Sequence, residues 1–385
     1  MTTAATVLPV SLKRTVDESY AITIGWNLAE AIGDFATSDR FAGSRLVMIT
    51  DDIVRETIAH RIQAELRHRG RDPLVLSFPP GEGNKTRQTK ELLEDRMIEA
   101  NLGRDTLVIA VGGGVVSDMA GFVAGTFTRG VPYVNCPTTL LSAADASVGG
   151  KTGVDTNAAT NLIGVFHQPA AVFIDLAAWS TLPPAEVRNG MAETVKHACL
   201  ADAPLFDFLV DRCVGADIES GGILADREFC QRVATRNCEI KAQFVTQDVH
   251  EADLRMVLNL GHTFGRALEA AAGYTLSHGQ AVSIGLCLQA RLGLRFGYVA
   301  EADVRRVQRL LKAIGLPTDL PAEISDDLLL DKMRKDKKVR GGVFRFVFQR
   351  GIGDFVRFDD GRASVSVPED VIRDFLLTEA REPYL

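Results

Sequence analysis

Residues 105–114 read DTLVIAVGGG, and this stretch decides the fold because a short apolar run stops at three glycines. The apolar run predicts a buried strand, and residues 115–126 predict an apolar helix directly after it. Glycines between a strand and a helix let the backbone approach a pyrophosphate held at the helix N-terminus. The spacing is not GxGxxG, and a tight turn explains three glycines equally well, so the motif depends on its neighbours.

The neighbouring segments repeat the same alternation. Helices are predicted at 28–35, at 53–69 with Asp52 as its cap, and at 89–101, and buried strands at 20–25, 45–50, 73–78, 133–136 and 171–175. Repeated β-α-β units with nearly continuous apolar strands predict a parallel sheet covered on both faces. Ligands bind at the carboxyl ends of such strands, where Glu82, Lys85 and Asp118 are expected.

The alternation stops after residue 175, and helical periodicity follows. Helices are predicted at 184–201, 204–213, 226–248, 251–269, 280–296, 301–314 and 368–378. Residues 343–349 and 354–358 predict a small late hairpin. We therefore expect an α/β nucleotide-binding domain at 1–182 and an all-α metal and substrate domain at 183–385, joined by a tight hinge over a cleft.

Residues 251–269, EADLRMVLNLGHTFGRALE, carry polar residues at helical spacing. One continuous helix would place Glu251, Arg255, Asn259, His262 and Arg266 on one face, with apolar residues over most of the rest. Such a face predicts a buried helix whose polar stripe lines a cavity. A solvated stripe on a surface helix is the alternative, although solvated stripes are normally rich in Lys and Glu.

The loop after residue 136 is rich in hydroxyls and glycine, PTTLLSAADASVGGKTGVDTNAATNLIG. Backbone N–H groups of a Gly-Gly turn and the ammonium of Lys151 suit an anion, and Arg129 lies nearby in sequence. A turn-rich surface loop with one lysine is the alternative.

Two imidazoles and a carboxylate form a common catalytic zinc set, and Glu193, His262 and His278 could bind one divalent ion. Packed or surface histidines are the alternative, because the spacing is not HExxH. Lys196 lies on the same helical face as Glu193. The basic run that includes Lys337 is either a solvated loop or a binding segment for an anionic substrate.

Composition excludes several classes of protein. A formal charge of -7 argues against a general nucleic-acid binder, and scattered cysteines argue against a disulfide or Cys-metal framework. No apolar run reaches membrane-spanning length and no signal peptide is evident, so we expect a cytoplasmic protein without a membrane partner.

The ordered motifs resemble those of the sugar phosphate cyclases, most closely the 3-dehydroquinate synthase family. They are PPGEGNKT, VGGGVVSDMAGFVAGTFTRGVP, PTTLLSAADASVGGKTG, NLIGVFHQP, NGMAETVKHA, CEIKA, LNLGHTFG, SHGQAVSIG and DKK. The resemblance implies an NAD-binding domain, a helical metal domain, an active site between them and a homodimer.

The resemblance also implies residue roles. Glu193, His262 and His278 would bind Zn²⁺ (or Co²⁺), Glu251 would accept a proton, and Arg129 would reach a neighbouring subunit's phosphate pocket. The NAD site would include Asp51, Glu82, Lys85, Gly113, Gly114, Val115, Asp118, Thr138, Thr139 and Thr160, with Thr181 nearby. The sugar phosphate would face Asp145, Lys151, Asn161, Lys196, Lys241, Arg255, Asn259, Arg266 and Lys337 or Lys338.

The implied reaction converts 3-deoxy-arabino-heptulosonate 7-phosphate to 3-dehydroquinate, in the shikimate pathway of aromatic amino acid biosynthesis, with loss of phosphate and NAD recycled. Arg255 favours this carboxylated substrate over sedoheptulose 7-phosphate. Arg266 replaces a histidine, and Thr160 replaces a lysine that contacts NAD in the family. These departures keep open an aminodehydroquinate synthase, a valiolone-type cyclase, a polyol dehydrogenase or an inactive binding protein.

Overall fold

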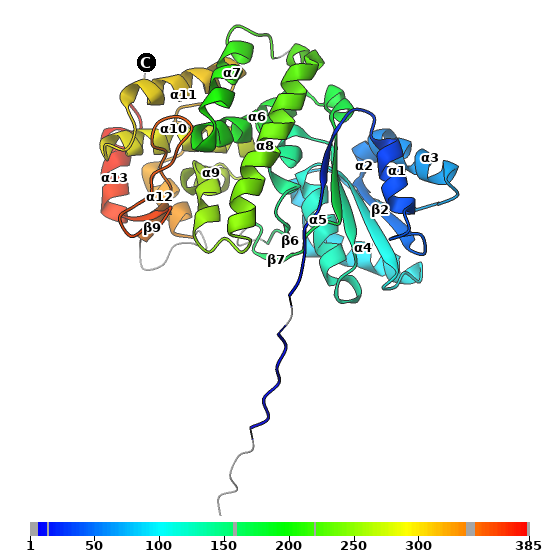
Figure 1. Ribbon diagram of the computed structural model, residues 1–385. Helices are drawn as coiled ribbons and strands as arrows, with labels where there is room; N and C mark the ends of the chain where they lie inside the picture. Colours follow the sequence, from blue (N-terminus) through cyan, green and yellow to red (C-terminus); the bar gives the residue numbers. More distant parts are fainter. Residues whose placement is uncertain (1–6, 14, 157–159, 219–220, 336–342, 383–385) are drawn as a thin grey trace, which may run out of the picture.

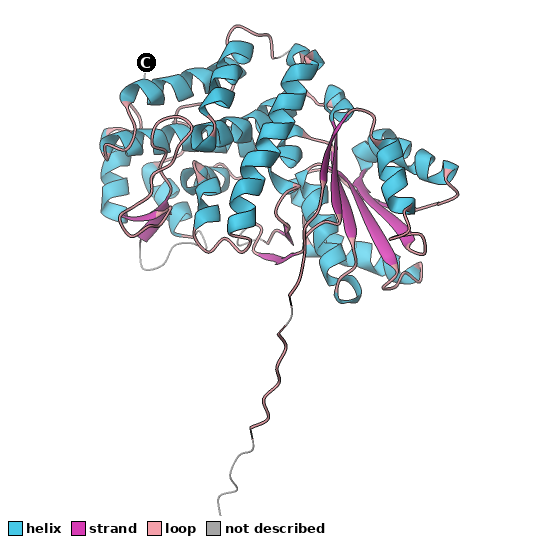
Figure 2. Ribbon diagram, viewed as in Figure 1, coloured by secondary structure: helices cyan, strands magenta, loops and turns pink. Residues whose placement is uncertain are grey.

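The first half of the chain forms a six-stranded parallel sheet with helices on both faces, as predicted (Figures 1 and 2). The computed structural model describes residues 7–13, 15–156, 160–218, 221–335 and 343–382. The strand order is β1-β8-β5-β4-β2-β3, with β1 Ile22–Gly25, β2 Arg45–Asp51, β3 Leu74–Phe78, β4 Thr106–Gly112, β5 Tyr133–Pro137 and β8 Ala171–Asp175.

Two apolar layers cover this sheet. One face packs against α4 (Arg87–Glu99) and α5 (Gly114–Thr126), and the other against α1 (Ala29–Thr37) and α3 (His60–His68). The helix before α3 begins as α2 (Asp52–Val54) and continues as a π-helix, η1 (Arg55–Ala59). Its cap is Asp51, whose Oδ1 accepts hydrogen bonds from the N–H groups of Ile53 and Val54, so the prediction of Asp52 as the cap is wrong.

The order of strands places a switch point between β2 and β4. The chain passes from β2 to its neighbour β3 on one side, and then returns across β2 to β4 on the other. Asp51 ends β2, and Gly113 and Gly114 follow β4, so these residues flank the crevice in which open α/β sheets bind ligands.

Short helical elements lie in the loops of the first half. They are the 3₁₀ helices η2 (Glu82–Asn84) after β3, η3 (Phe127–Arg129) after α5 and η5 (Leu176–Thr181) after β8, and the π-turn η4 (Ser142–Ala146) after β5. The loop that was predicted to bind an anion also contains an antiparallel pair, β6 (Lys151–Val154) and β7 (Ile163–Phe166). This pair was not predicted, and its strands have four residues each.

The second half is mostly helical, which confirms the predicted fold class. It contains η6 (Gly222–Ala225), η7 (Leu254–Asn259), α6 (Pro184–Ala201), α7 (Ala203–Cys213), α8 (Arg227–Gln247), α9 (His262–Ala271), α10 (His278–Arg295), α11 (Glu301–Ile314), α12 (Asp326–Arg334) and α13 (Glu369–Thr378). β9 (Val343–Phe346) pairs with β10 (Val365–Pro368), so the predicted hairpin of residues 343–349 with 354–358 is wrong for its first four residues. The end next to the turn does pair: Gln349 bridges Phe355, the N–H of Val356 donates to the Phe348 carbonyl oxygen at 2.8 Å, and that of Arg350 donates to the Asp354 carbonyl oxygen at 2.9 Å.

The predicted single helix over residues 251–269 is also wrong. η7 ends at Asn259, Gly261 has φ of +78°, and α9 begins at His262. A left-handed residue cannot continue a right-handed helix, so the chain changes direction at the glycine. None of the helices within the described ranges is both long and apolar enough to cross a membrane.

Helices α9 and α10 pack closely, and Gly285 makes this contact possible. A Cβ at position 285 would collide with the carbonyl oxygen of Gly261 and lie 2.9 Å from the amide nitrogen of Gly265. We expect Gly285→Ala to lower the free energy of unfolding by about 3 kcal/mol, because the obstructing atoms are backbone. Denaturant unfolding measures this loss, with Gly43→Ala as the control, where nothing lies within 4 Å of the added Cβ. Equal stability of the two variants would contradict the prediction.

Candidate active site

Three predicted metal ligands converge from three helices. Glu193 lies within α6, and His262 and His278 are the first residues of α9 and α10. The Nε2 atoms of His262 and His278 lie 3.3 and 3.2 Å from Glu193 Oε1. The three ligand atoms lie within 4.8 Å of one another, so one divalent ion could contact all three.

Each imidazole is oriented through its other nitrogen. His262 Nδ1 lies 3.1 Å from the carbonyl oxygen of Leu260, and His278 Nδ1 lies 2.9 Å from Glu269 Oε1. Because both partners can only accept, each Nδ1 carries its proton and donates it. Each Nε2 atom faces Glu193. Metal-binding histidines commonly donate the other ring N–H to a carbonyl or carboxylate oxygen in this way.

Local structure positions the two histidines. The left-handed Gly261 lets α9 begin with His262, and Ser277 forms a capping box with Gln280 at the start of α10. Asn189 Oδ1 accepts the N–H of Gly279 at 2.5 Å, which ties the start of α10 to α6.

Charge compensation is a strong constraint here because Glu193 is completely buried. Burial alone would raise the pKa of Glu193, but Lys196 and the two histidines lower it well below its ordinary value. Burial would likewise lower the pKa of His278, yet hydrogen bonds to Glu193 and Glu269 raise it to about 10. A cation bound to Nε2 would take the place of that proton, so the donor set fits a divalent metal.

A second acidic cluster beside the first is a poor cation site. Asp145, Glu193 and His197 also have ligand atoms within 4.8 Å of one another. However, the ammonium of Lys241 donates to Asp145 at 2.6 Å, and that of Lys196 contacts Glu193. Two buried ammoniums already neutralise the carboxylates, so the cluster positions charges around the first site.

The metal cluster borders a cleft of about 450 Å³ through His262, and this volume suits a small phosphorylated sugar. Most of the predicted substrate residues line this cleft: Asp145, Lys151, Asn161, Lys196, Lys241, Glu251, Arg255, Asn259 and Arg266. Although the single helix was not found, its five polar residues still meet in this cleft. Arg129 is exposed and is not among the lining residues, and Lys337 and Lys338 lie outside the described residues.

The polar groups in the cleft form a chain of contacts. Lys151 forms an ion pair with Glu251 Oε2, and Asn259 Nδ2 donates to Glu251 Oε1 at 2.7 Å. Arg266 Nη2 donates to Asn259 Oδ1 at 3.0 Å. Glu251 has φ of +57°, an unfavourable conformation for a residue with a side chain, and such strain often accompanies function.

Arg255 lies at one side of the cleft with 2% of its surface exposed. Its Nη1 donates to the carbonyl oxygen of Val249 at 2.6 Å and its Nη2 to that of Gly149 at 3.0 Å. A guanidinium has five N–H donors, so further donors remain for a ligand.

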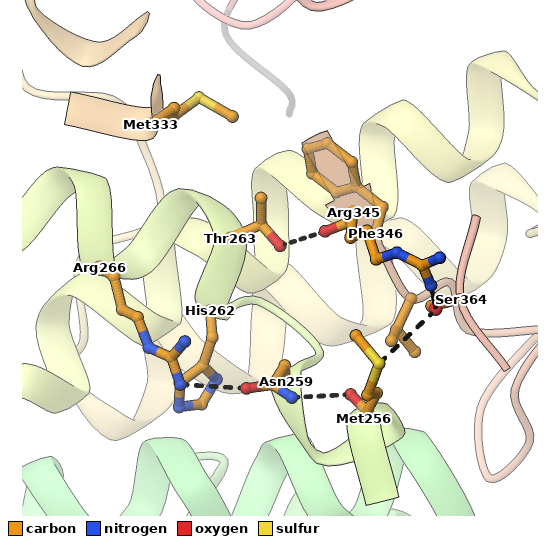
Figure 3. Close-up of a pocket in the computed structure, with 10 residues that line it drawn as sticks. Met256, Asn259, His262, Thr263, Arg266, Met333, Arg345, Phe346 and Ser364 are labelled. Atoms are coloured by element: carbon orange, nitrogen blue, oxygen red, sulfur yellow. Dashed lines mark hydrogen bonds between the residues drawn. The ribbon is translucent and has the colours of Figure 1, made fainter. Parts of the chain in front are cut away.

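A small pocket shares Asn259, His262 and Arg266 with the cleft (Figure 3). Its other side is formed by Arg345, and Thr263 Oγ1 donates to the Arg345 carbonyl oxygen at 2.9 Å. The volume of about 20 Å³ is enough for a water molecule but not for a sugar phosphate.

The predicted cofactor residues gather at the switch point of the sheet. Asp51 and the glycines flank it, and Lys85 donates to Asp118 at 2.6 Å. Burial would lower the pKa of Lys85, but Asp118, Glu82 and Asp155 raise it above its ordinary value.

Thr138 and Thr139 stand beside the glycines at the end of β5. Thr139 Oγ1 accepts the N–H of Ser142 at 3.1 Å. Thr138 Oγ1 is buried and has no hydrogen-bond partner among the described residues. An unpaired hydroxyl beside a helix N-terminus fits a polar cofactor such as a dinucleotide.

The remaining predicted cofactor residues lie further out. Val115 is in the first turn of α5, Thr181 ends η5, and Thr160 precedes β7 and is half-buried.

Sequence reasoning missed Glu269 and Asp155. Glu269 lies within the quoted stretch 251–269, but only the folded structure places it against His278. Asp155 Oδ1 accepts the N–H of Asn161 at 2.7 Å, and its own N–H donates to the Lys85 carbonyl oxygen at 2.8 Å. Asp155 therefore links the cofactor loop to the substrate loop.

The chain is similar to known proteins of one family over most of its length. The family described as 3-dehydroquinate synthase N-terminal matches residues 75–189, and the C-terminal family matches residues 190–339. A 3-dehydroquinate synthase from Pelobacter propionicus is 42% identical over 342 residues, which are 88% of this chain and 93% of that protein. The corresponding protein from Caulobacter vibrioides is 39% identical over 356 residues, 91% of this chain and 95% of that protein.

Solved structures with the same fold include two other cyclases. A 2-epi-5-epi-valiolone synthase from Streptomyces hygroscopicus with NAD⁺ and Zn²⁺ bound has a TM-score of 0.83 and 30% identity, covering 96% of this chain and 99% of that one. A 2-deoxy-scyllo-inosose synthase complexed with carbaglucose-6-phosphate, NAD⁺ and Co²⁺ has a TM-score of 0.80 and 27% identity, covering 92% and 95%. Glycerol dehydrogenase from Schizosaccharomyces pombe, 16% identical with a TM-score of 0.63 over 94% of this chain and 90% of that one, shares the fold alone.

The contact between Glu269 and His278 predicts an effect on metal affinity. We expect Glu269→Gln to weaken zinc binding about 10- to 100-fold, because the amide is a weaker acceptor for the imidazole N–H. Competition with a chromophoric chelator measures the affinity. Glu65→Gln, which changes a carboxylate paired with Arg69 on α3, is the control. Unchanged zinc affinity in Glu269→Gln would contradict the assigned orientation of His278.

Proposed function

The chain belongs to the 3-dehydroquinate synthase family, and from this premise we propose that its cleft converts 3-deoxy-arabino-heptulosonate 7-phosphate to 3-dehydroquinate with loss of phosphate. The observation that carries the proposal is the cluster of Glu193, His262 and His278, whose His262 lines a cleft that also contains cationic side chains and Glu251. The cofactors are NAD at the switch point of the sheet and Zn²⁺ or Co²⁺ at the three ligands.

The two cofactors, when bound, supply a hydride acceptor that returns its hydride and a Lewis acid for the substrate oxygens. The chain itself binds and orients the substrate. Arg255 donates its remaining N–H groups to the carboxylate, and Lys151 and Asn161 bind the phosphate. Binding at both ends fixes the sugar across the metal ligands.

Glu251 is the proposed proton acceptor. Its carboxylate is held by Lys151 and Asn259, so its oxygens have a defined direction within the cleft. Lys196 and Lys241 also line the cleft, where their ammonium groups would stabilise negative charge that develops on oxygens of the sugar. The net reaction releases phosphate, and the hydride that is removed from the sugar is returned to it.

Another sugar phosphate cyclase activity is the second candidate. Arg266 and Thr160 depart from the family pattern, and structural relatives include cyclases named for other products. Arg255 favours the carboxylated substrate, because a buried guanidinium that lacks its anion would be costly.

Phosphate release distinguishes these candidates. With NAD and zinc present, we expect release from the carboxylated heptulosonate phosphate, and not from sedoheptulose 7-phosphate. Arg255→Met should lower kcat/KM by about 100-fold or more, since a buried charge-assisted contact is lost. Release only from an amino analogue or from sedoheptulose 7-phosphate would favour the second candidate. Accumulation of NADH without phosphate would instead indicate a dehydrogenase.

Arg129 supports a homodimer with shared sites. It is exposed, and it has φ of +72° beside Thr128 at +49°, which costs backbone energy without an evident local use. We propose that this strained turn presents Arg129 to the phosphate site of a second copy.

Mixing two inactive variants tests that arrangement. Arg129→Ala and Glu251→Gln subunits should each lose activity, and their mixture should recover about a quarter of it, because half the dimers are hybrids with one intact site. Activity is measured after unfolding and refolding the two variants together. No recovery, with hybrid dimers shown by native mass spectrometry, would place Arg129 in its own subunit's site or outside both.

A further inference from the structure

Tyr20 lies before β1 and outside the residues matched by the family models, yet it contacts the substrate loop. Its hydroxyl oxygen accepts the N–H of Gly149 at 3.0 Å, across 129 positions of the sequence. Its ring packs against the apolar core shared by β8 and the helices of the second half. The contact therefore joins the start of the chain to the Gly149-Gly150 turn.

Gly149 in turn contacts Arg255 directly. The carbonyl oxygen of Gly149 accepts from Arg255 Nη2 at 3.0 Å. Gly149 has φ of +95°, and a Cβ there would collide with the same Nη2 atom. The guanidinium thus lies against bare backbone, so its position follows that of Gly149.

Backbone hydrogen bonds hold the neighbours of Gly149, with Gly150 accepting the N–H of His167 at 2.8 Å, whereas the contacts of Gly149 itself are to the side chains of Tyr20 and Arg255. Gly149 lies between η4 and β6, outside any helix or strand. It is buried, and a buried N–H that loses its acceptor costs about 1–3 kcal/mol. Removing the Tyr20 hydroxyl would leave the turn free to find another acceptor, and the carbonyl that orients Arg255 would move with it.

We propose that Tyr20 is a positioning residue that holds Arg255, through Gly149, toward the carboxylate of the substrate. The inference rests on the proposed function, because it assumes that Arg255 binds that carboxylate. Tyr20 is not among the residues lining the cleft, so it acts on substrate binding through Arg255.

The test compares Tyr20→Phe with the unchanged protein. We expect KM for the carboxylated heptulosonate phosphate to rise about 5- to 10-fold with kcat changed less than twofold, because binding is affected and not the reacting atoms. Calorimetry on the zinc-loaded protein without NAD should show the same loss of affinity in the absence of turnover. Tyr298→Phe, which removes a hydroxyl from an aromatic cluster in the second half, is the control.

A double-mutant cycle separates positioning from general destabilisation. In an Arg255→Lys background, Tyr20→Phe should cause no further loss of affinity, because the contact that it supports is already absent. Equal losses in both backgrounds, or no loss in Tyr20→Phe alone, would overturn the inference while leaving the proposed function intact. Failure of the unchanged protein to bind this substrate or release its phosphate would overturn the proposed function, and this inference with it.

Discussion

The buried carboxylate of Glu193 is the constraint on which the rest of the helical half depends. A fully buried carboxylate needs compensating positive charge, which Lys196 and His278 supply, and His262 faces the same carboxylate from a third helix. α6, α9 and α10 must therefore approach closely, which Gly279 and Gly285 permit by having no side chain. The same helix contacts form the core and position the metal ligands, so the ligand geometry is as rigid as those contacts.

Charges in the cleft are paired with one another before any substrate binds. Lys151 contacts Glu251, Lys241 contacts Asp145, and Arg255 donates to two backbone carbonyl groups. These contacts fix the side chains in place, so a sugar phosphate would meet donors that already have a direction. These side chains therefore lose conformational entropy during folding, so a smaller loss of entropy opposes substrate binding.

Much of the fold could be predicted from local pattern, because buried parallel strands are apolar runs that end in glycine or a capping residue. The chain from β2 to α5 shows this clearly. The failures have local physical causes: Gly261 interrupts the predicted helix, and β9 pairs with β10 instead of the nearer segment. Glu269 and Tyr20 could not be assigned roles, since their partners His278 and Gly149 become neighbours only through tertiary packing. The resemblance supplied candidate ligands, and the structure supplied their orientation.

Arg266 departs from the family pattern, yet it still orients a neighbouring side chain of the site. Arginine cannot act as a base at neutral pH, so no proton can be taken up at this position. Its Nη2 donates to Asn259 Oδ1, which leaves the amide Nδ2 of Asn259 pointing at Glu251 Oε1. A flipped amide would bring its oxygen against the carboxylate and its NH₂ against the guanidinium, and both contacts would be repulsive. Arg266 thus fixes the orientation of Asn259, and the proton-accepting role in the proposed reaction rests on Glu251 alone among this linked set of side chains.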